Sequence, residues 1–397
     1  MRILLLSTYP AVNPAHGGQH RLSQIAKALE ADGHSVEFHG ILGSASYADT
    51  PGYLRFPGTN ALSRYLANPM LMEDWAIGQY AADPAGGFKQ LGKLCGDRYD
   101  AVFCEQPWLF EFAYKQFSQK RRRALLIYGS QNVEHRLKYE IAESYLTAAL
   151  AEKYSSLVEE VECFAARNSD LNIVVSDNDK QWITSVSDTP VVLAANGVAD
   201  RRAGIRDVQR SNSVATCRKF ALYCASSHPP NIQGFYDIFG NGIGCLAPDE
   251  RVVVAGGAGA QIVSDSRFNR VSGLSKKFVA AGEVTESELS GLLATAHVLI
   301  LPITRGGGTN LKTAEALWSG RHVVGTTIAM RGFEDFCSTR GLVIADDPSA
   351  FQKAIREAMS SPALQLEAAE RQQRSRVLWA STLKDLTSAL RKFETVT

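Results

Sequence analysis

The sequence shows no excess of charge of either sign. Its 397 residues include 42 Lys and Arg and 41 Asp and Glu, for a formal net charge of +1. Proteins whose main partner is nucleic acid usually carry a basic surface, so the composition argues against that class. Short basic runs at 120–123 and 201–202 leave two explanations open, solvated loops or peripheral contact with an anionic lipid surface.

Cysteines are few and follow no pattern. The seven are scattered, odd in number, and contain no Cys-x-x-Cys pair. This pattern suggests neither a disulfide framework nor a zinc site, and the histidines and cysteines lack the spacing of a metal-binding motif. We therefore expect a protein of the reducing cytoplasm that binds no metal.

Long hydrophobic runs are also absent. No stretch is long and apolar enough to span a bilayer, and we expect the short apolar run at 2–7 to be a first β-strand and not part of a signal peptide. The composition, 45% hydrophobic and 21% charged, is typical of a soluble globular protein. A chain of this length usually forms two domains.

The order of expected elements indicates two α/β domains. In the first half a strand at 2–7, a Gly17-Gly18 loop and a helix at 19–31 open a βαβ unit, and a helix is expected over about 140–166. Residues 44–87 resemble an insertion, residues 199–212 an interdomain linker, and about 364–393 a C-terminal helical segment. Further strands are expected at 35–40, 99–104, 124–128, 170–176, 220–225, 251–255, 297–301, 322–326 and 341–345.

This pattern predicts two doubly wound parallel sheets, in which ligands bind beyond the carboxyl ends of the strands. A central cleft between two Rossmann-like domains is implied. We place an N-terminal domain at 1–199, a second domain at 213–375, and a C-terminal helix at 376–397 that packs back across the junction.

The glycine-rich run 305–315 is the clearest sign of a ligand. It follows an apolar strand and opens a helix, so its backbone N–H groups and the positive end of the helix dipole favour a diphosphate. Lys312 and Glu315 share one helical face. Two alternatives remain: a surface ion pair beside a flexible turn, and a Walker A loop in which Leu311 replaces the second glycine.

A nicotinamide-dependent dehydrogenase is disfavoured. Its fingerprint requires G-x-G-x-x-G directly after the first strand and an acidic residue at a fixed distance beyond it. Here Gly17-Gly18 follows a long loop instead, and no acidic residue stands at that spacing.

Taken together, these features resemble the retaining glycosyltransferases of the GT-B fold, and in particular family 4 (group 1). The resemblance covers most of the chain, including Gly17-Gly18 and Asn196-Gly197-Val198. It is strongest at residues 281–284, 288–289, 301–302, 306–312, 315–317, 320, 323–324, 326 and 331–332. It implies transfer of a sugar from a nucleotide diphosphate sugar to a carbohydrate, lipid-linked or protein acceptor, as in polysaccharide biosynthesis, without a metal or another cofactor.

The resemblance also implies roles for individual residues. The position of Glu315 implies that it binds the ribose hydroxyls, and the loop around Gly308 implies that the backbone holds the pyrophosphate. The implied donor-binding residues are Gly17, Gly18, Gly257, Val284, Gly307, Gly308, Thr309, Asn310, Leu311 and Glu315. The implied catalytic or charge-stabilising residues are Glu105, His135, Lys312 and Arg305.

Two departures from the family pattern stand out. Many relatives carry a glutamate where this chain has Gly307, and an arginine and a lysine where it has the run 226–231. Arg305 and Lys312 are the substitutes we expect to neutralise the phosphates.

The first half offers several polar candidates after its strands. These are Glu105 and Gln106 after one strand, and Gln131, Asn132, Glu134 and His135 after the next. Each has an ordinary structural alternative, such as a helix cap. Besides a transferase, a non-catalytic nucleotide-sugar or glycan-binding scaffold and a nucleotide-sugar 2-epimerase remain possible functions. The base, the sugar and the acceptor are not determined.

Overall fold

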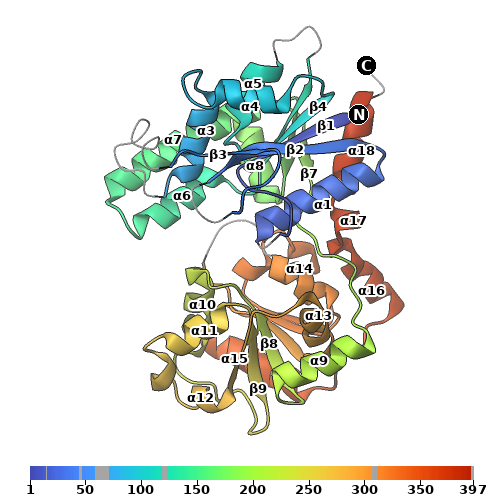
Figure 1. Ribbon diagram of the computed structural model, residues 1–397. Coiled ribbons are helices and arrows are strands. Elements are labelled where there is room, and N and C mark those ends of the chain that lie inside the picture. Colours follow the sequence, from blue (N-terminus) through green and yellow to red (C-terminus); the bar gives the residue numbers. More distant parts are fainter. Residues whose placement is uncertain are drawn as a thin grey trace. The chain divides into compact units, whose positions relative to one another are not determined.

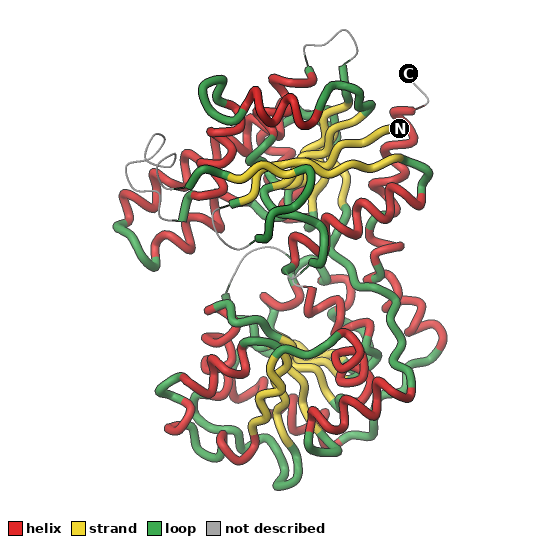
Figure 2. The backbone as a smooth tube through the Cα atoms, viewed as in Figure 1, coloured by secondary structure: helices red, strands yellow, loops and turns green. Residues whose placement is uncertain are grey.

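The computed structural model describes residues 1–14, 16–43, 47–58, 71–118, 123–305, 309 and 311–394. The chain divides into two compact units (Figure 1). The first, here the first domain, comprises residues 1–195 together with 383–397, and the second domain comprises residues 196–382. Each is a parallel sheet covered by helices (Figure 2).

The first domain contains a seven-stranded parallel sheet of order β3-β2-β1-β4-β5-β6-β7. Strands β1 and β4 are almost wholly buried, because helices cover both faces of a parallel sheet and both faces must then be apolar. The strands are β1 (Arg2–Ser7), β2 (Ser35–Leu42), β3 (Tyr53–Arg55), β4 (Ala101–Glu105), β5 (Leu125–Gly129), β6 (Leu171–Val174) and β7 (Val191–Leu193).

The helices of this domain include one from the end of the chain. Helix α18 packs against β7, and Arg391 on α18 forms an ion pair with Asp32, which follows α1. The helices are α1 (Gly17–Ala31), α3 (Glu73–Ala82), α4 (Phe88–Cys95), α5 (Phe110–Phe117), α6 (Glu134–Glu143), α7 (Ala148–Asn168), α8 (Asp177–Val186) and α18 (Lys384–Glu394).

The second domain contains a six-stranded parallel sheet of order β10-β9-β8-β11-β12-β13. Its strands are β8 (Phe220–Cys224), β9 (Arg251–Ala255), β10 (Phe278–Gly282), β11 (Val298–Leu301), β12 (His322–Gly325) and β13 (Leu342–Ile344). Its α-helices are α9 (Ile205–Ala215), α10 (Pro229–Phe239), α11 (Ala258–Ser264), α12 (Leu274–Lys277), α13 (Glu286–Thr295), α14 (Leu311–Trp318), α15 (Pro348–Ser360), α16 (Ala368–Arg374) and α17 (Trp379–Thr382).

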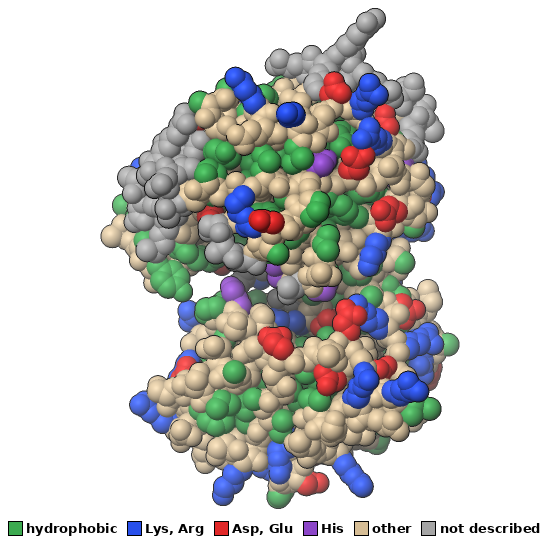
Figure 3. Space-filling view, viewed as in Figure 1, with side chains coloured by type: hydrophobic (Ala, Val, Ile, Leu, Met, Phe, Trp, Pro, Cys, Tyr) green, Lys and Arg blue, Asp and Glu red, His purple; other side chains and the backbone are tan. Residues whose placement is uncertain are grey.

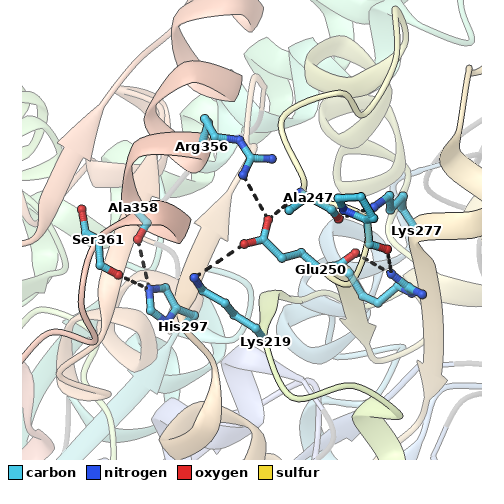
Figure 4. Close-up of polar contacts among 10 residues, drawn as sticks. Lys219, Ala247, Glu250, Lys277, His297, Arg356, Ala358 and Ser361 are labelled. Carbon is cyan, nitrogen blue, oxygen red and sulfur yellow. Dashed lines mark hydrogen bonds and ion pairs between the residues drawn. The ribbon is translucent and has the colours of Figure 1, made fainter.

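A buried carboxylate lies at the amino ends of β8 and β9 (Figure 4). Glu250 accepts hydrogen bonds from the Ala247 backbone N–H at 2.7 Å and from Arg356 of α15 at 3.3 Å, and Lys219 lies 3.6 Å from it. Beside it, the His297 ring contacts the carbonyls of Ala358 and Ser361 near the end of α15. These contacts attach α15 to the edge of the sheet opposite the carboxyl ends of the strands.

The buried Arg374 of α16 caps the carboxyl end of α14. Its guanidinium donates to the carbonyl oxygens of Leu317 at 3.1 Å, Arg321 at 3.2 Å and Arg340 at 2.8 Å. A cation at a helix carboxyl terminus satisfies unpaired carbonyls and complements the helix dipole. Arg374 therefore stabilises the helix that carries Lys312 and Glu315.

The structure corrects three predictions about elements. The linker predicted over 199–212 is wrong from residue 205 onward, where α9 begins. The single helix predicted over 140–166 is two helices, α6 and α7, that pack against each other. Gly17 and Gly18 form the first turn of α1 and are not a separate loop.

The mixed composition is also visible on the surface. On the face shown in Figure 3, Lys and Arg side chains are interspersed with Asp and Glu side chains. Among the described helices, none is both long enough and apolar enough to cross a membrane.

Candidate functional site

Three loops of the second domain meet at the carboxyl ends of β8, β9 and β10. The Gly256 N–H donates to the Gly282 carbonyl at 2.7 Å, and the Ala258 N–H donates to the Ala225 carbonyl at 3.1 Å. Gly256 has φ +100°, and a Cβ there would lie 2.4 Å from the Ala225 oxygen. Only glycine allows the backbones to approach this closely.

Two predicted donor-binding residues lie in these loops. A Cβ added to Gly257 would lie 3.1 Å from Glu283 Oε1 and 3.3 Å from the Ser227 Cβ. Val284 follows Glu283 and is partly buried against the apolar core of the sheet. The structure therefore brings the β8, β9 and β10 loops together around Gly257.

Lys312 projects from the first turn of α14 to the first turn of α10. Its Nζ donates a hydrogen bond to Asn231 Oδ1 at 2.6 Å, and the Asn231 amide donates to the Ser226 carbonyl at 2.9 Å. Burial lowers the pKa of Lys312 to about 8, although Cys224 and Glu315 act in the opposite direction. A lysine in such a site gains its charge most readily when an anion binds beside it.

Glu315 lies one helical turn beyond Lys312 and is partly exposed. Burial raises its pKa to about 7, while Lys312 and Arg201 act to lower it. The same surroundings raise the pKa of the Cys224 thiol, mainly through burial and then through Glu315. A cation and a carboxylate that both titrate near neutrality therefore occupy the start of α14.

Part of the glycine-rich run is described. Arg305 is exposed and forms no hydrogen bond or ion pair with the described residues. Thr309 Oγ1 accepts a hydrogen bond from Asn196 Nδ2 at 2.7 Å, and Leu311 is the first residue of α14. The predicted donor-binding residues Gly307, Gly308 and Asn310 lie outside the described residues, as does Gly306.

In the first domain, Gly17 and Gly18 open α1 beside Tyr9. Gly17 is exposed, whereas a Cβ added to Gly18 would lie 2.7 Å from the Tyr9 hydroxyl. Gln131 donates to the Tyr9 hydroxyl and to Glu105 Oε1, at 2.5 Å in each case. Glycine at position 18 thus leaves room for the tyrosine that continues this network.

Glu105 is completely buried at the end of β4. It forms an ion pair with Arg21 Nε at 3.3 Å, and Arg21 also donates to the Ala194 carbonyl at 2.8 Å. Burial raises the pKa of Glu105, and Arg21 and Gln131 partly offset that effect. Because the carboxylate has no exposed surface, we interpret Glu105 as acting through Gln131; its predicted catalytic role stays a prediction.

His135 is held by a second buried carboxylate, Glu162 of α7. The His135 Nδ1 lies 2.7 Å from Glu162 Oε2, and its ring packs against Trp182 with 5.2 Å between ring centroids. Glu162 also accepts the backbone N–H groups of Glu134 at 2.7 Å and His135 at 2.9 Å, so it caps α6. The predicted catalytic role of His135 likewise stays a prediction.

The sequence interpretation missed several contacts. Asn196 and Asn231 hold the glycine-rich run and Lys312, respectively, although each lies far from its partner in sequence. Asn196 stood out in the sequence only as part of the Asn196-Gly197-Val198 resemblance, and Asn231 only as part of the run 226–231. Among the described residues, no three His, Cys, Asp or Glu side chains form a group that could hold a metal ion.

Part of the second domain matches a known protein family. Residues 220–361 match the family model described as "Glycosyl transferases group 1". This stretch contains the β8–β10 loops, Lys312 and Glu315. No curated protein sequence matches the chain.

Solved structures match the chain over essentially its whole length. A sucrose-phosphate synthase from Thermosynechococcus elongatus has a TM-score of 0.71 at 16% identity, with 100% of each chain covered. Anabaena HepE, solved with UDP and glucose, has a TM-score of 0.66 at 13% identity, with 99% of this chain and 100% of that one covered. A UDP-forming α,α-trehalose-phosphate synthase from Burkholderia xenovorans, solved with glucose-6-phosphate, has a TM-score of 0.58 at 15% identity, with 100% and 99% covered.

At these identities the structural matches establish the fold alone, and the family model matches the larger part of the second domain. The predicted α/β architecture with two Rossmann-like domains is confirmed. The chain has the GT-B fold, and its residues 220–361 match the group 1 glycosyltransferase family model, in agreement with the predicted glycosyltransferase.

Proposed function

We propose that the chain is a retaining, metal-independent glycosyltransferase of family 4. It would move a sugar from a nucleotide diphosphate sugar to a glycan, lipid-linked or other acceptor. The observation that carries this proposal is the arrangement at the start of α14, where Lys312 is held by Asn231 and Glu315 lies one turn away, within the matched domain.

The donor would be bound by charge and by the helix terminus. The Lys312 ammonium and the first N–H groups of α14 would face the diphosphate. The Glu315 carboxylate would accept hydrogen bonds from the ribose hydroxyls, and the loops around Gly257 and Val284 would flank the base. HepE was solved with UDP-glucose, which supports a nucleotide sugar as the donor.

The chemistry would rest on stabilisation of the leaving group. Glycosyl transfer places negative charge on the departing diphosphate, and fixed cations and backbone dipoles stabilise that charge. For retention we propose that the acceptor attacks from the face that the diphosphate leaves, with no protein nucleophile. The nucleotide sugar is then a co-substrate, and no cofactor takes part.

The cellular setting is part of the same proposal. We place the protein in the cytoplasm, with peripheral membrane contact if its acceptor is lipid-linked, and with a role in polysaccharide biosynthesis. Neighbours solved with glucose and glucose-6-phosphate support a sugar as acceptor.

The first test is donor binding by Glu315→Ala. UDP-, GDP-, ADP- and dTDP-sugars are screened for thermal stabilisation, and the best ligand is titrated by calorimetry. We expect Glu315→Ala to bind it at least tenfold more weakly, a loss of about 1.4 kcal/mol. The control, Glu357→Ala, removes an exposed carboxylate of α15. Equal affinity of Glu315→Ala and the parent would contradict the assignment.

A non-catalytic scaffold is the second candidate, because Gly307 stands where many relatives carry a glutamate. A scaffold would bind a nucleotide sugar and never release the nucleoside diphosphate. A 2-epimerase would instead interconvert the donor sugar, which the same screen detects.

A further inference from the structure

A carboxylate with one oxygen fixed and the other open lies at the carboxyl ends of β4 and β5. It belongs to Glu134, the first residue of α6, which is only 3% exposed. Glu134 belongs to the first domain, whereas Lys312 and Glu315 belong to the second.

Two side-chain amides fix the first oxygen. Glu134 Oε1 accepts hydrogen bonds from Gln106 Nε2 and Asn132 Nδ2, each at 3.1 Å. Gln106 has φ +66°, a left-handed conformation that is strained for a residue with a side chain, and its N–H donates to the Gly129 carbonyl at 2.8 Å. Strain of this kind is kept where the surrounding structure fixes a side chain for a purpose.

The second oxygen is available. None of the described residues donates a hydrogen bond to Glu134 Oε2. This oxygen also differs from the fully buried polar atoms that lack a partner, because it keeps some contact with solvent. The carboxylate therefore presents a single oriented acceptor. Such a group suits a neutral hydroxyl donor, whereas the phosphate of a nucleotide would be repelled.

The neighbouring histidine is engaged elsewhere. The His135 Nδ1 and its backbone N–H both contact Glu162, and Trp182 packs against the ring. Those contacts fix the start of α6 and thereby aim Glu134. His135 is therefore engaged by Glu162 and Trp182, whereas Glu134 keeps one carboxylate oxygen available.

We propose that Glu134 binds a hydroxyl group of the acceptor sugar through Oε2, with Gln106 and Asn132 as positioning residues for its carboxylate. This inference rests on the proposed glycosyltransferase function, since it assigns the acceptor side of that reaction. The ligand class is a polyhydroxy compound that offers a hydroxyl donor.

The ionisation of Glu134 supports the assignment. Burial and then Glu162 raise its pKa to about 7, while Asn132, Lys138 and Gln106 act to lower it. The hydroxyls of Tyr9 and Tyr128 also interact with Glu134, and the pKa of each is raised, mainly by burial. Below about pH 7 the carboxylate becomes protonated and no longer accepts hydrogen bonds as an anion. The affinity for the acceptor sugar should therefore decrease as the pH is lowered.

The test compares Glu134→Gln with Glu140→Gln. Both changes convert a glutamate of α6 into its amide, but Glu140 is exposed. Release of nucleoside diphosphate is measured with the donor selected by the screen above. The acceptor is glucose, or whichever free hexose of a panel gives turnover.

We expect Glu134→Gln to lower kcat/KM for the acceptor at least tenfold with the donor KM within twofold of the parent. The fall in acceptor affinity below about pH 7 should also disappear. Glu140→Gln should match the parent. Asn132→Ala, which keeps the carboxylate but removes one of its donors, should raise the acceptor KM several-fold, and it provides the test if Glu134→Gln fails to fold.

Glu134→Gln or Asn132→Ala with the acceptor kinetics of the parent would overturn the inference. An equal change in donor and acceptor KM would also overturn it, because that result indicates a structural role. Absence of any release by the parent would instead contradict the proposed function itself.

Discussion

Residue spacing predicted part of the donor site. Lys312 and Glu315 are three positions apart, and side chains at that spacing share a helical face whatever the tertiary structure. The contact of Lys312 with Asn231 joins two helices separated by 81 positions. Nothing local in the sequence fixes such a contact, because it depends on how α10 and α14 pack on the sheet.

The ionisation of Lys312 leads to a prediction about pH. An ammonium with a pKa near 8 is protonated at neutral pH and loses its charge as the pH rises. The affinity for the nucleoside diphosphate should therefore fall above about pH 8, at a somewhat higher pH in the complex because the anion favours the charged form. Calorimetric titrations between pH 7 and 9.5 measure this dependence.

In the same titrations Lys312→Met should bind at least tenfold more weakly at pH 7 and show a flatter dependence. The control is Lys353→Met, which removes an exposed cation of α15. A Lys312→Met protein with the affinity and pH dependence of the parent would exclude the ammonium from the phosphate site.

At the scale of elements, apolar strands were predicted well and polar helices were not. The expected strands at 2–7, 251–255 and 322–326 agree with β1, β9 and β12 within one residue, because buried parallel strands are continuous apolar runs. Helix α9 was mistaken for a linker because most of its residues are polar. It packs against α13 through small residues, since a Cβ at Gly291 would clash with the Asp207 carbonyl.

The break between α6 and α7 was missed for a similar reason. Residues 144–147 carry no Gly or Pro to mark an interruption. In the structure Thr147 is extended, with φ −69° and ψ 150°, and α7 begins directly after it. Helix boundaries of this kind depend on partners that local sequence does not specify.

The Glu250 network should affect stability and not ligand binding. In Glu250→Leu the carboxylate is removed while Arg356, Lys219 and the Ala247 N–H remain without it. We expect a loss of about 3 kcal/mol in the free energy of unfolding, measured by urea denaturation. Affinity for the nucleoside diphosphate should be unchanged, because the network lies at the opposite edge of the sheet. Asp249→Leu, an exposed neighbour, is the control.

A large loss of nucleotide affinity in folded Glu250→Leu would show that the two edges of the sheet are coupled. Stability equal to that of Asp249→Leu would show that the network contributes nothing.

At the scale of the whole molecule, the site should reduce stability at neutral pH. The pKa of Glu315 is raised to about 7, above its ordinary value of 4.5. Between about pH 4.5 and 7 the Glu315 carboxyl is therefore protonated in the folded protein but ionised in the unfolded chain. The contribution of this group to the free energy of unfolding decreases as the pH rises through that range. Catalytic and binding sites often carry such a cost.

Glu315→Gln should remove that dependence. We expect the variant to be more stable than the parent at pH 8, and the difference to shrink toward pH 5, in urea unfolding monitored by circular dichroism. Glu357→Gln should follow the parent at both values. If Glu315→Gln is less stable than the parent at pH 8, the carboxylate is stabilising and our interpretation of its environment is wrong.

The overall architecture could be predicted because strand and helix patterns alternate twice along the chain and the glycine-rich run falls in the second series. The polar cluster around Glu134 could be predicted only as a list of residues after two strands. The structure shows that Glu162, on the later helix α7, engages the His135 ring and the backbone of Glu134. The Glu134 carboxylate therefore stays available while His135 does not, and the local sequence could not predict this.

The central claim is sugar transfer from a nucleotide diphosphate donor. Time-resolved proton NMR of the parent with the donor selected by the screen, together with a panel of hexose acceptors, observes donor, product and anomeric configuration at once. We predict release of the nucleoside diphosphate, a product with the anomeric configuration of the donor, and at least tenfold slower release by Glu315→Ala at subsaturating donor. Tight donor binding without release under any acceptor, or interconversion of the donor sugar alone, would contradict the account.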